Sequence, residues 1–180
     1  EKIERAKPRI MVFCGRGSSG HVGVYLRYLF EVRLGMLASA AAPSVVTAYR
    51  RPPDFRDALF VVVSQSGRSP DVIDATQMAR KFGALTLAIV NDEKSPAAAA
   101  SELVLPIGAG IEQSVAATKT VVLSMVAGAR LVAALAHDDD LSGGLQNLPQ
   151  RLSEALACDW SPWAERAAGA AAAFIVGRGY

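Results

Sequence analysis

The chain of 180 residues has few of the side chains that build disulfides and metal sites. It contains two cysteines, Cys14 and Cys158, and two histidines. Two cysteines cannot form the disulfide framework of a small secreted domain, and no cysteine–histidine cluster has the spacing of a zinc site. The sequence therefore predicts no metal and no cofactor. It favours a reducing, cytoplasmic setting.

The chain also has little excess charge of either sign and few long apolar runs. The 19 Lys and Arg residues and the 17 Asp and Glu residues leave a net charge of +2, without a long basic block. Because nucleic-acid-binding domains concentrate Lys and Arg on one face, we expect no nucleic acid partner. The longest strongly apolar stretch, 120–136, is interrupted by Arg130 and is shorter than the roughly 20 residues of a membrane span. We expect a buried helix there and no membrane partner.

The two ends of the chain carry few signals. Residues 1–7 are charged and lack the apolar core of a signal peptide. Because the chain does not begin with Met, we expect a fragment of a longer protein.

The pattern along the chain predicts an α/β fold. Hydrophobic residues make up 51% of the chain and charged residues 20%, which is enough for a packed core. Short apolar runs alternate with helix-length segments, as in a parallel sheet with helices on both faces. The expected strands are 9–14, 36–40, 58–63, 84–90 and 102–107, and the expected helices are 21–34, 44–49, 70–82, 113–136, 144–157 and 162–170. Five such strands predict a three-layer sandwich.

One short segment near the start is echoed at the end. Residues 12–17 read VFCGRG and residues 174–179 read FIVGRG, and both are apolar runs that lead into Gly-Arg-Gly. The second follows a complete five-strand unit, so we expect a second copy of the unit to begin there. The predicted division is a first domain over 1–140, a helical connection over 141–171 and the first strand of a truncated second domain over 172–180.

The first strand leads into Gly15-Arg16-Gly17-Ser18-Ser19-Gly20, which spells the dinucleotide fingerprint G-x-G-x-x-G between a strand and a helix. That fold also needs an acidic residue about 20 residues further on to hold the ribose hydroxyl. No Asp or Glu occurs between Leu34 and Pro53, although Arg50 and Arg51 would suit a phosphorylated ribose. A dinucleotide-dependent oxidoreductase therefore stays an alternative, as does a plain tight turn.

The strongest strand, 58–63, leads into Ser64-Gln65-Ser66-Gly67-Arg68-Ser69. An anion bound there would meet three hydroxyls, free backbone N–H groups and the positive end of a helix dipole. A helix cap would explain one serine but not three. Both loops follow neighbouring parallel strands at the edge where open α/β sheets bind ligands. A phosphate on the second loop and hydroxyls on the first describe a sugar phosphate.

Several other residues are candidates with alternatives. Glu112 is a possible acid or base and Lys119 a possible charge partner, or they are a first-turn acid and a solvated lysine. His21 lies at the mouth of the first loop and could touch the ligand, whereas His137 is interpreted as a solvated helix end. Cys14 is interpreted as inert packing.

These stretches together resemble the sugar isomerase (SIS) family. The resemblance is carried by Gly17-Ser18-Ser19, by Tyr28-Leu29-Phe30-Glu31, by the Ser64–Ser69 loop and by Glu112 with 115–119 (VAATK), and it covers nearly the whole chain. The family includes the isomerase part of glutamine–fructose-6-phosphate aminotransferase and related amino-sugar-phosphate deaminases. The resemblance implies a flavodoxin-like five-stranded sheet, two such domains per subunit and a homodimer.

The resemblance also implies roles for particular residues. It implies that Ser64, Gln65, Ser66 and Ser69 hold the substrate phosphate, with Ser18 and Ser19 near the sugar. Val115 and Ala117 match positions that contact sugar, but Ala117 replaces a serine found in some relatives. The family's catalytic carboxylate, histidine and lysine would lie beyond Tyr180, which leaves Glu112 as the candidate within this chain.

The function expected from the resemblance is that of an aldose–ketose isomerase or amino-sugar-6-phosphate deaminase or aminotransferase. No glutaminase domain precedes the matching region, which favours a deaminase over a synthase. The expected substrate is a hexose 6-phosphate such as fructose 6-phosphate or glucosamine 6-phosphate. The alternative is a non-catalytic regulator that senses a sugar phosphate.

Overall fold

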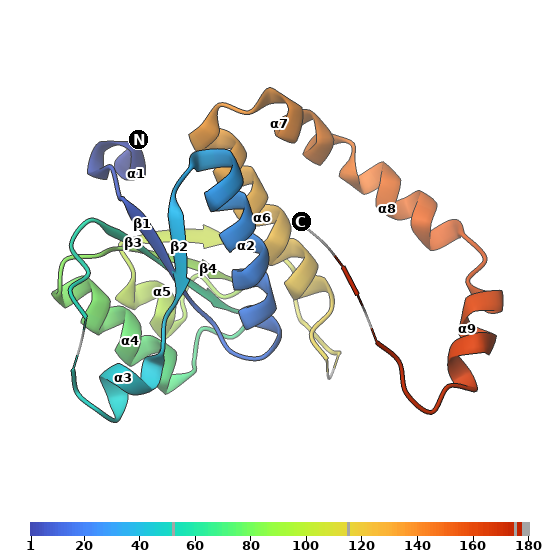
Figure 1. Cartoon of the computed structure of the whole chain (residues 1–180), viewed down its shortest axis with the longest axis horizontal. Coiled ribbons are helices and arrows are strands. Elements are labelled where there is room, and N and C mark those ends of the chain that lie inside the picture. Colours follow the sequence, from blue (N-terminus) through green and yellow to red (C-terminus); the bar gives the residue numbers. More distant parts are fainter. Residues whose placement is uncertain (52, 115, 175, 178–180) are drawn as a thin grey trace.

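A single parallel sheet forms the centre of the molecule (Figure 1). The computed structural model describes residues 1–51, 53–114, 116–174 and 176–177. The strands, in chain order, are β1 Ile10–Cys14, β2 Leu37–Ala40, β3 Ala58–Ser64, β4 Leu85–Val90 and β5 Leu103–Pro106. Their order in the sheet is β2-β1-β3-β4-β5, and every pair is parallel. This is the flavodoxin-like order, so the predicted fold class is confirmed.

The helices are α1 Lys2–Ala6, α2 Ser18–Leu34, α3 Pro43–Thr47, α4 Pro70–Lys81, α5 Pro96–Ala100, α6 Lys119–Ala136, α7 Asp139–Gln146, α8 Leu148–Ala157 and α9 Ser161–Ala168. Three helix boundaries correct the prediction. The helix expected from residue 21 begins at Ser18. The helix expected from residue 113 begins at Lys119. The helix expected over 144–157 is divided at Asn147 into α7 and α8, and Pro149 lies in the first turn of α8. The short helices α1 and α5 were not predicted.

Helices cover both faces of the sheet, which makes three layers. On one face, α2 and α6 pack over apolar side chains of β1, β3 and β4. The two helices lie so close that a Cβ added at Gly128 would stand 2.1 Å from a methyl group of Leu26. On the other face lie α3, α4 and α5. All seven residues of β3 are buried, as expected of the central strand.

Three apolar residues that recur every four positions on α2, Val24, Tyr28 and Val32, face outward. These side chains are 50%, 44% and 59% exposed. The opposite side of the helix supplies the fully buried Leu26 and Phe30. Helix α2 is therefore apolar on two sides, and one of them has no cover within the described residues.

Helix α6 is buried on one face only, which modifies the prediction of a buried helix. Its buried residues recur at helical spacing, namely Thr120, Ser124, Gly128, Ala129, Val132 and Ala133. Among the described helices, α6 alone is long and apolar enough to cross a membrane, with a mean hydropathy of 1.6. A helix that packs one face on the core of a soluble protein has the same length and composition.

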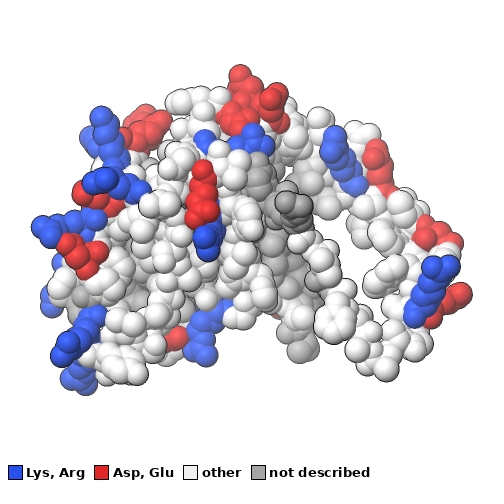
Figure 2. Space-filling model, viewed as in Figure 1, with Lys and Arg blue, Asp and Glu red and all other residues white. Residues whose placement is uncertain are grey.

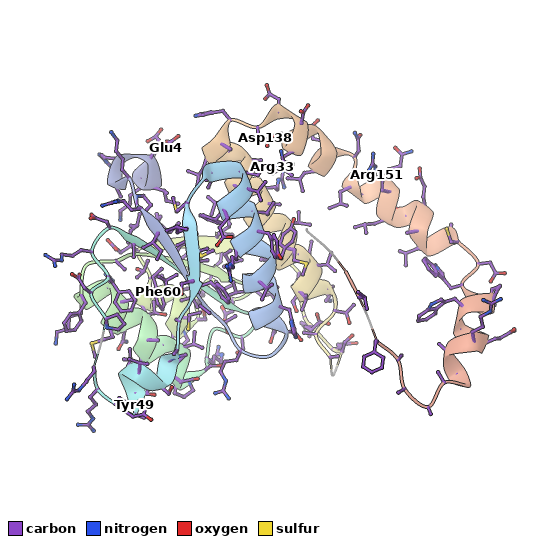
Figure 3. The ribbon with its side chains drawn as sticks, viewed as in Figure 1. Glu4, Arg33, Tyr49, Phe60, Asp138 and Arg151 are labelled. Carbon is purple, nitrogen blue, oxygen red and sulfur yellow. The ribbon has the colours of Figure 1, made fainter. Side chains whose placement is uncertain are left out.

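The last three helices form an arm that leaves the body (Figure 1). An ion pair of 3.1 Å between Arg33 of α2 and Asp138 fixes the base of the arm, where Asp138 also caps α7 (Figure 3). Helices α8 and α9 contain no buried residue. Residues 172–174 and 176–177 have no regular secondary structure, and residues 175 and 178–180 lie outside the described part. The expected second domain stays a prediction.

Candidate functional site

The two predicted loops lie side by side at one edge of the sheet. Strand β1 pairs with β3 in parallel, with Cys14 opposite Val62, so both strands enter their loops at the same edge. An ion pair of 2.9 Å joins Arg16 of the first loop to Asp71 in the first turn of α4. The structure therefore brings the glycine loop and the serine loop together, as the sequence predicts.

The serine loop folds around its own hydroxyl groups. Ser64 is the buried last residue of β3, and its Oγ accepts the Gly67 N–H at 3.0 Å. The Oγ of Ser66 accepts the Arg68 N–H at 3.3 Å. Ser69 occupies the N-cap position of α4, but its side chain makes no capping hydrogen bond. A helix cap therefore does not explain the three serines.

Hydrogen-bond donors remain available where α4 begins. Among the described residues, no acceptor pairs with the backbone N–H of Ser66 or of Ser69. Both side chains are half-buried, and Gln65 beside them is exposed. The first turn of the 12-residue helix α4 adds the positive end of its dipole. This serine cradle, residues 64–69, has the donors that a phosphate group requires.

The unpredicted helix α5 holds the serine cradle in place. Gly67 has a φ of +62°, and a Cβ added there would lie 2.2 Å from Ser95 Oγ. The Gly67 carbonyl accepts the N–H of Ala97 at 3.0 Å. The pair Ser95-Pro96 is a typical helix start, since serine is a favoured N-cap and proline a favoured first residue. This local signal could have revealed α5.

The glycine loop makes a tight turn into α2. Gly17 is the N-cap of α2 with a φ of +53°, and Ser18 and Ser19 are the half-buried first residues of the helix. A Cβ added at Gly15 would stand 2.9 Å from the carbonyl oxygen of Ser19. Strand β2 ends at Ala40 without an acidic residue, so the ribose ligand of a dinucleotide site has no candidate there.

The third predicted segment follows β5, which β4 separates from β3. Asn91, just beyond β4, fixes this segment by donating to the Gly110 carbonyl at 2.7 Å and accepting the Ala109 N–H at 2.8 Å. Sequence reasoning missed Asn91, although it follows a strand at the same edge. Ala117 is half-buried before α6, and Val115 lies outside the described residues.

Glu112 caps the start of α6. Its carboxylate accepts the N–H groups of Thr118 and Thr120 and the Thr120 hydroxyl at 2.9–3.2 Å. Hydrogen bonds to the ionised form, the backbone N–H of Thr120 first, lower the pKa of Glu112 to about 2. A carboxylate with so low a pKa is a poor proton acceptor. The geometry makes Glu112 a capping acid in the loop before α6 rather than the first-turn acid of the alternative interpretation, because α6 begins only at Lys119. Lys119 is exposed, as a solvated lysine is.

The remaining single candidates have unremarkable surroundings. Burial, with a smaller effect of the Asp71 charge, raises the pKa of the Cys14 thiol to about 12, which fits inert packing. His21 is exposed on the first turn of α2. His137 ends α6 in a left-handed conformation, 3.9 Å from Glu4. On the face seen in Figure 2, Lys and Arg are interspersed with Asp and Glu.

The fold and the cradle define a doubly wound α/β domain with a serine-rich loop at the carboxyl edge of its sheet. The model of the SIS domain matches residues 2–134, so the chain belongs to the SIS domain family. The resemblance stated from the sequence is thereby confirmed.

Curated relatives are larger proteins. Glutamine–fructose-6-phosphate aminotransferase [isomerizing] from Symbiobacterium thermophilum is 34% identical over 179 residues, which cover 93% of this chain and 29% of that protein. The chain thus spans less than a third of the length of this relative.

Solved structures share the fold. A candidate phosphosugar isomerase from Silicibacter pomeroyi DSS-3 is 43% identical with a TM-score of 0.86, over 88% of this chain and 49% of that chain. Glucosamine-6-phosphate deaminase from Thermotoga maritima is 24% identical with a TM-score of 0.67, over 83% of this chain and 47% of that chain. The Vibrio vulnificus NanR protein, complexed with ManNAc-6P, is 23% identical with a TM-score of 0.64, over 87% of this chain and 60% of that chain. The last two show the fold alone.

Proposed function

We propose that this chain is the sugar-phosphate-binding unit of a phosphosugar isomerase, or of an amino-sugar-6-phosphate deaminase or aminotransferase. The proposed substrate is a hexose 6-phosphate such as fructose 6-phosphate or glucosamine 6-phosphate. The observation that carries the proposal is the serine cradle, with its available N–H groups at the start of α4. Its neutral donors suit a phosphomonoester that must bind and leave.

The arrangement of the loops gives each a separate task. The cradle would hold the phosphate through Ser64, Gln65, Ser66 and Ser69. The length of the phosphate ester linkage would then set the distance between the cradle and the sugar ring. The glycine loop on the neighbouring strand would place Ser18 and Ser19 beside the sugar hydroxyls. Aldose–ketose isomerisation also needs a positioned base. Glu112 is engaged in capping α6, so we expect the isolated chain to bind substrate but turn it over slowly.

A regulator that senses a sugar phosphate is the second candidate. The carboxylate of Asp71 beside the cradle favours it, because Asp71 pairs with Arg16 rather than standing free for proton transfer. NanR from Vibrio vulnificus, complexed with ManNAc-6P, has the same fold. Exchange of substrate C–H hydrogen with deuterated water, catalysed by this chain even at a slow rate, would favour the enzyme over the sensor.

The binding proposal is tested by titration and thermal unfolding with fructose 6-phosphate, unphosphorylated fructose and NADPH. A ligand at 100 times its Kd adds about 2.7 kcal/mol to the free energy of unfolding. We expect stabilisation by the phosphorylated sugar only. Stabilisation by NADPH alone would overturn the proposal in favour of an oxidoreductase.

Ser66→Ala tests whether the cradle is the phosphate site. Removing a hydroxyl that donates to a phosphate should weaken binding by about 1.5–3 kcal/mol, because the acceptor is charged. Among the described residues, the hydrogen bond of the half-buried Ser66 hydroxyl is to the Arg68 N–H of the same loop, so the fold should persist. An unchanged Kd in the titration would exclude this loop from the site.

A further inference from the structure

An arginine side chain belongs to the serine cradle itself and is bound to a neighbouring carboxylate. Arg68 is 69% exposed, and its Nη2 donates to Asp92 Oδ2 at 3.1 Å. Its backbone N–H bonds to Ser66 Oγ, so the base of this side chain is anchored among the proposed phosphate ligands. Only the guanidinium end is turned toward another loop.

The position of the carboxylate does not depend on the arginine. Asp92 follows β4, the neighbour of β3, and its Oδ1 accepts the N–H of Lys94 at 3.0 Å. Its carbonyl accepts the N–H of Ser95, the N-cap of α5, also at 3.0 Å. The loop therefore holds Asp92 in place whether or not Arg68 is bound to it.

Two ion pairs border the cradle, and within each pair the charges cancel. Asp71 and Asp92 carry two negative charges, and Arg16 and Arg68 carry two positive charges in pairs with them. An arriving phosphate dianion gains a cation from these two pairs only when an arginine leaves its carboxylate. An exposed ion pair is weak, whereas the planar guanidinium fork matches a phosphate well. Arg68 can make this exchange without moving its backbone, because it already lies in the loop.

We propose that Arg68 is an exchangeable phosphate ligand and that Asp92 is its competing acceptor. When a sugar phosphate occupies the cradle, the guanidinium leaves Asp92 and donates to the phosphate oxygens. When the ligand leaves, Asp92 takes the guanidinium back. Asp92 thereby sets the affinity of the site although it does not touch the ligand. This inference rests on the proposed function, since it assigns a regulating residue to the same site.

The experiment is a double-mutant cycle on the Kd of fructose 6-phosphate. Arg68→Gln should weaken binding about tenfold, because a hydrogen bond between charged groups is lost. Asp92→Asn should tighten binding about two- to fivefold, which is the strength of an exposed ion pair that no longer competes. In the Arg68→Gln background, Asp92→Asn should give little or no gain. Glu93→Gln removes the same charge from the next, exposed position and should leave Kd unchanged.

Other outcomes separate a failure of the Arg68 exchange from a failure of the proposed sugar-phosphate binding. If Asp92→Asn tightens binding equally with and without Arg68, the carboxylate acts by repulsion alone and the exchange is wrong. An unchanged Kd for Arg68→Gln would also overturn it, while a weakened Kd for Ser66→Ala would leave the proposed function standing. Failure of the unmodified chain to bind fructose 6-phosphate would remove both. Thermal unfolding of each variant confirms that it is folded.

Discussion

Gly67 occupies the most constrained backbone position of the serine cradle. Two conditions meet there, a φ of +62° and a neighbouring side chain, Ser95, within 2.2 Å of where a Cβ would stand. The first condition disfavours every residue except glycine, and the second excludes any side chain at all. The shape of the cradle therefore depends on glycine at this residue and on the helix that packs against it.

Gly67→Ala should destabilise the domain by about 2–4 kcal/mol, because a left-handed backbone penalty adds to the overlap with Ser95. Gly35→Ala is the matched control, since Gly35, which ends α2 in the left-handed conformation, also has a positive φ but has no neighbouring atom within 4 Å of an added Cβ. Its loss should be about 1–2 kcal/mol. Urea unfolding measures both, and equal losses would mean that the contact with Ser95 carries no weight.

Sequence reasoning placed the serine loop correctly between a strand and a helix, but it missed residues that support this loop. Ser64, Ser66 and Ser69 were predicted because they form one continuous motif between a strand and a helix. Asp92 and Ser95 were missed because their role depends on β4 lying beside β3, which no local pattern reveals. Glu112 is the opposite case, because its residue type left a catalytic and a structural role open and its contacts are those of a cap.

At the level of the elements, the start of α6 illustrates how a loop decides a helix boundary. The apolar pattern suggested a helix from residue 113, yet the helix begins at Lys119. Thr118 at the N-cap position makes no side-chain cap, and Glu112 folds back to accept the first N–H groups instead. A cap supplied from six residues upstream is outside the spacings that helix-start rules consider.

Glu112→Gln should lower stability at neutral pH, because an amide oxygen is a weaker acceptor for the N–H groups of α6. The pKa of Glu112 is lowered from 4.5 to about 2 in the folded chain. The ionised cap therefore stabilises fully above pH 4.5 and is lost as the pH falls through about 2. Urea midpoints from pH 7 to pH 3 should differ most at pH 7 and converge in acid.

The control for this pH dependence is Glu165→Gln, which makes the same change on the exposed helix α9. Its urea midpoint should follow that of the unmodified chain at every pH. A gap between Glu112→Gln and the unmodified chain that stays constant from pH 7 to pH 3 would contradict the assignment of the cap to the ionised carboxylate.

At the scale of the whole molecule, apolar residues line the arm formed by α7, α8 and α9, from its base on the core to its exposed end. Its leucines recur every three or four residues: Leu141 and Leu145 pack on the core, Leu148 is half-buried, and Leu152 and Leu156 are 44% and 85% exposed. Trp160 and Trp163 continue the apolar surface. Gathered exposed apolar side chains mark contact sites in soluble proteins, and Figure 2 shows open space between the arm and the body.

We predict that a second copy of the chain covers these apolar residues of the arm, which gives the homodimer expected from the family resemblance a location. The body supplies a complementary surface in the exposed residues Val24, Tyr28 and Val32 of α2. Because both surfaces belong to one chain, a two-fold arrangement can bury the arm of each copy on α2 of the other. Light scattering after size exclusion should then give about twice the chain mass of 18.9 kDa.

Substitutions on α8 of the arm test whether the dimer forms through the arm. Leu152→Glu combined with Leu156→Glu should shift the mass to that of one chain, because two charges would have to be buried in the contact. Arg151→Glu, a charge change at a neighbouring exposed position of α8 (Figure 3), should leave the dimer intact. A dimer that survives the double substitution would place the contact elsewhere. A single-chain mass for the unmodified protein at all concentrations would contradict self-association altogether.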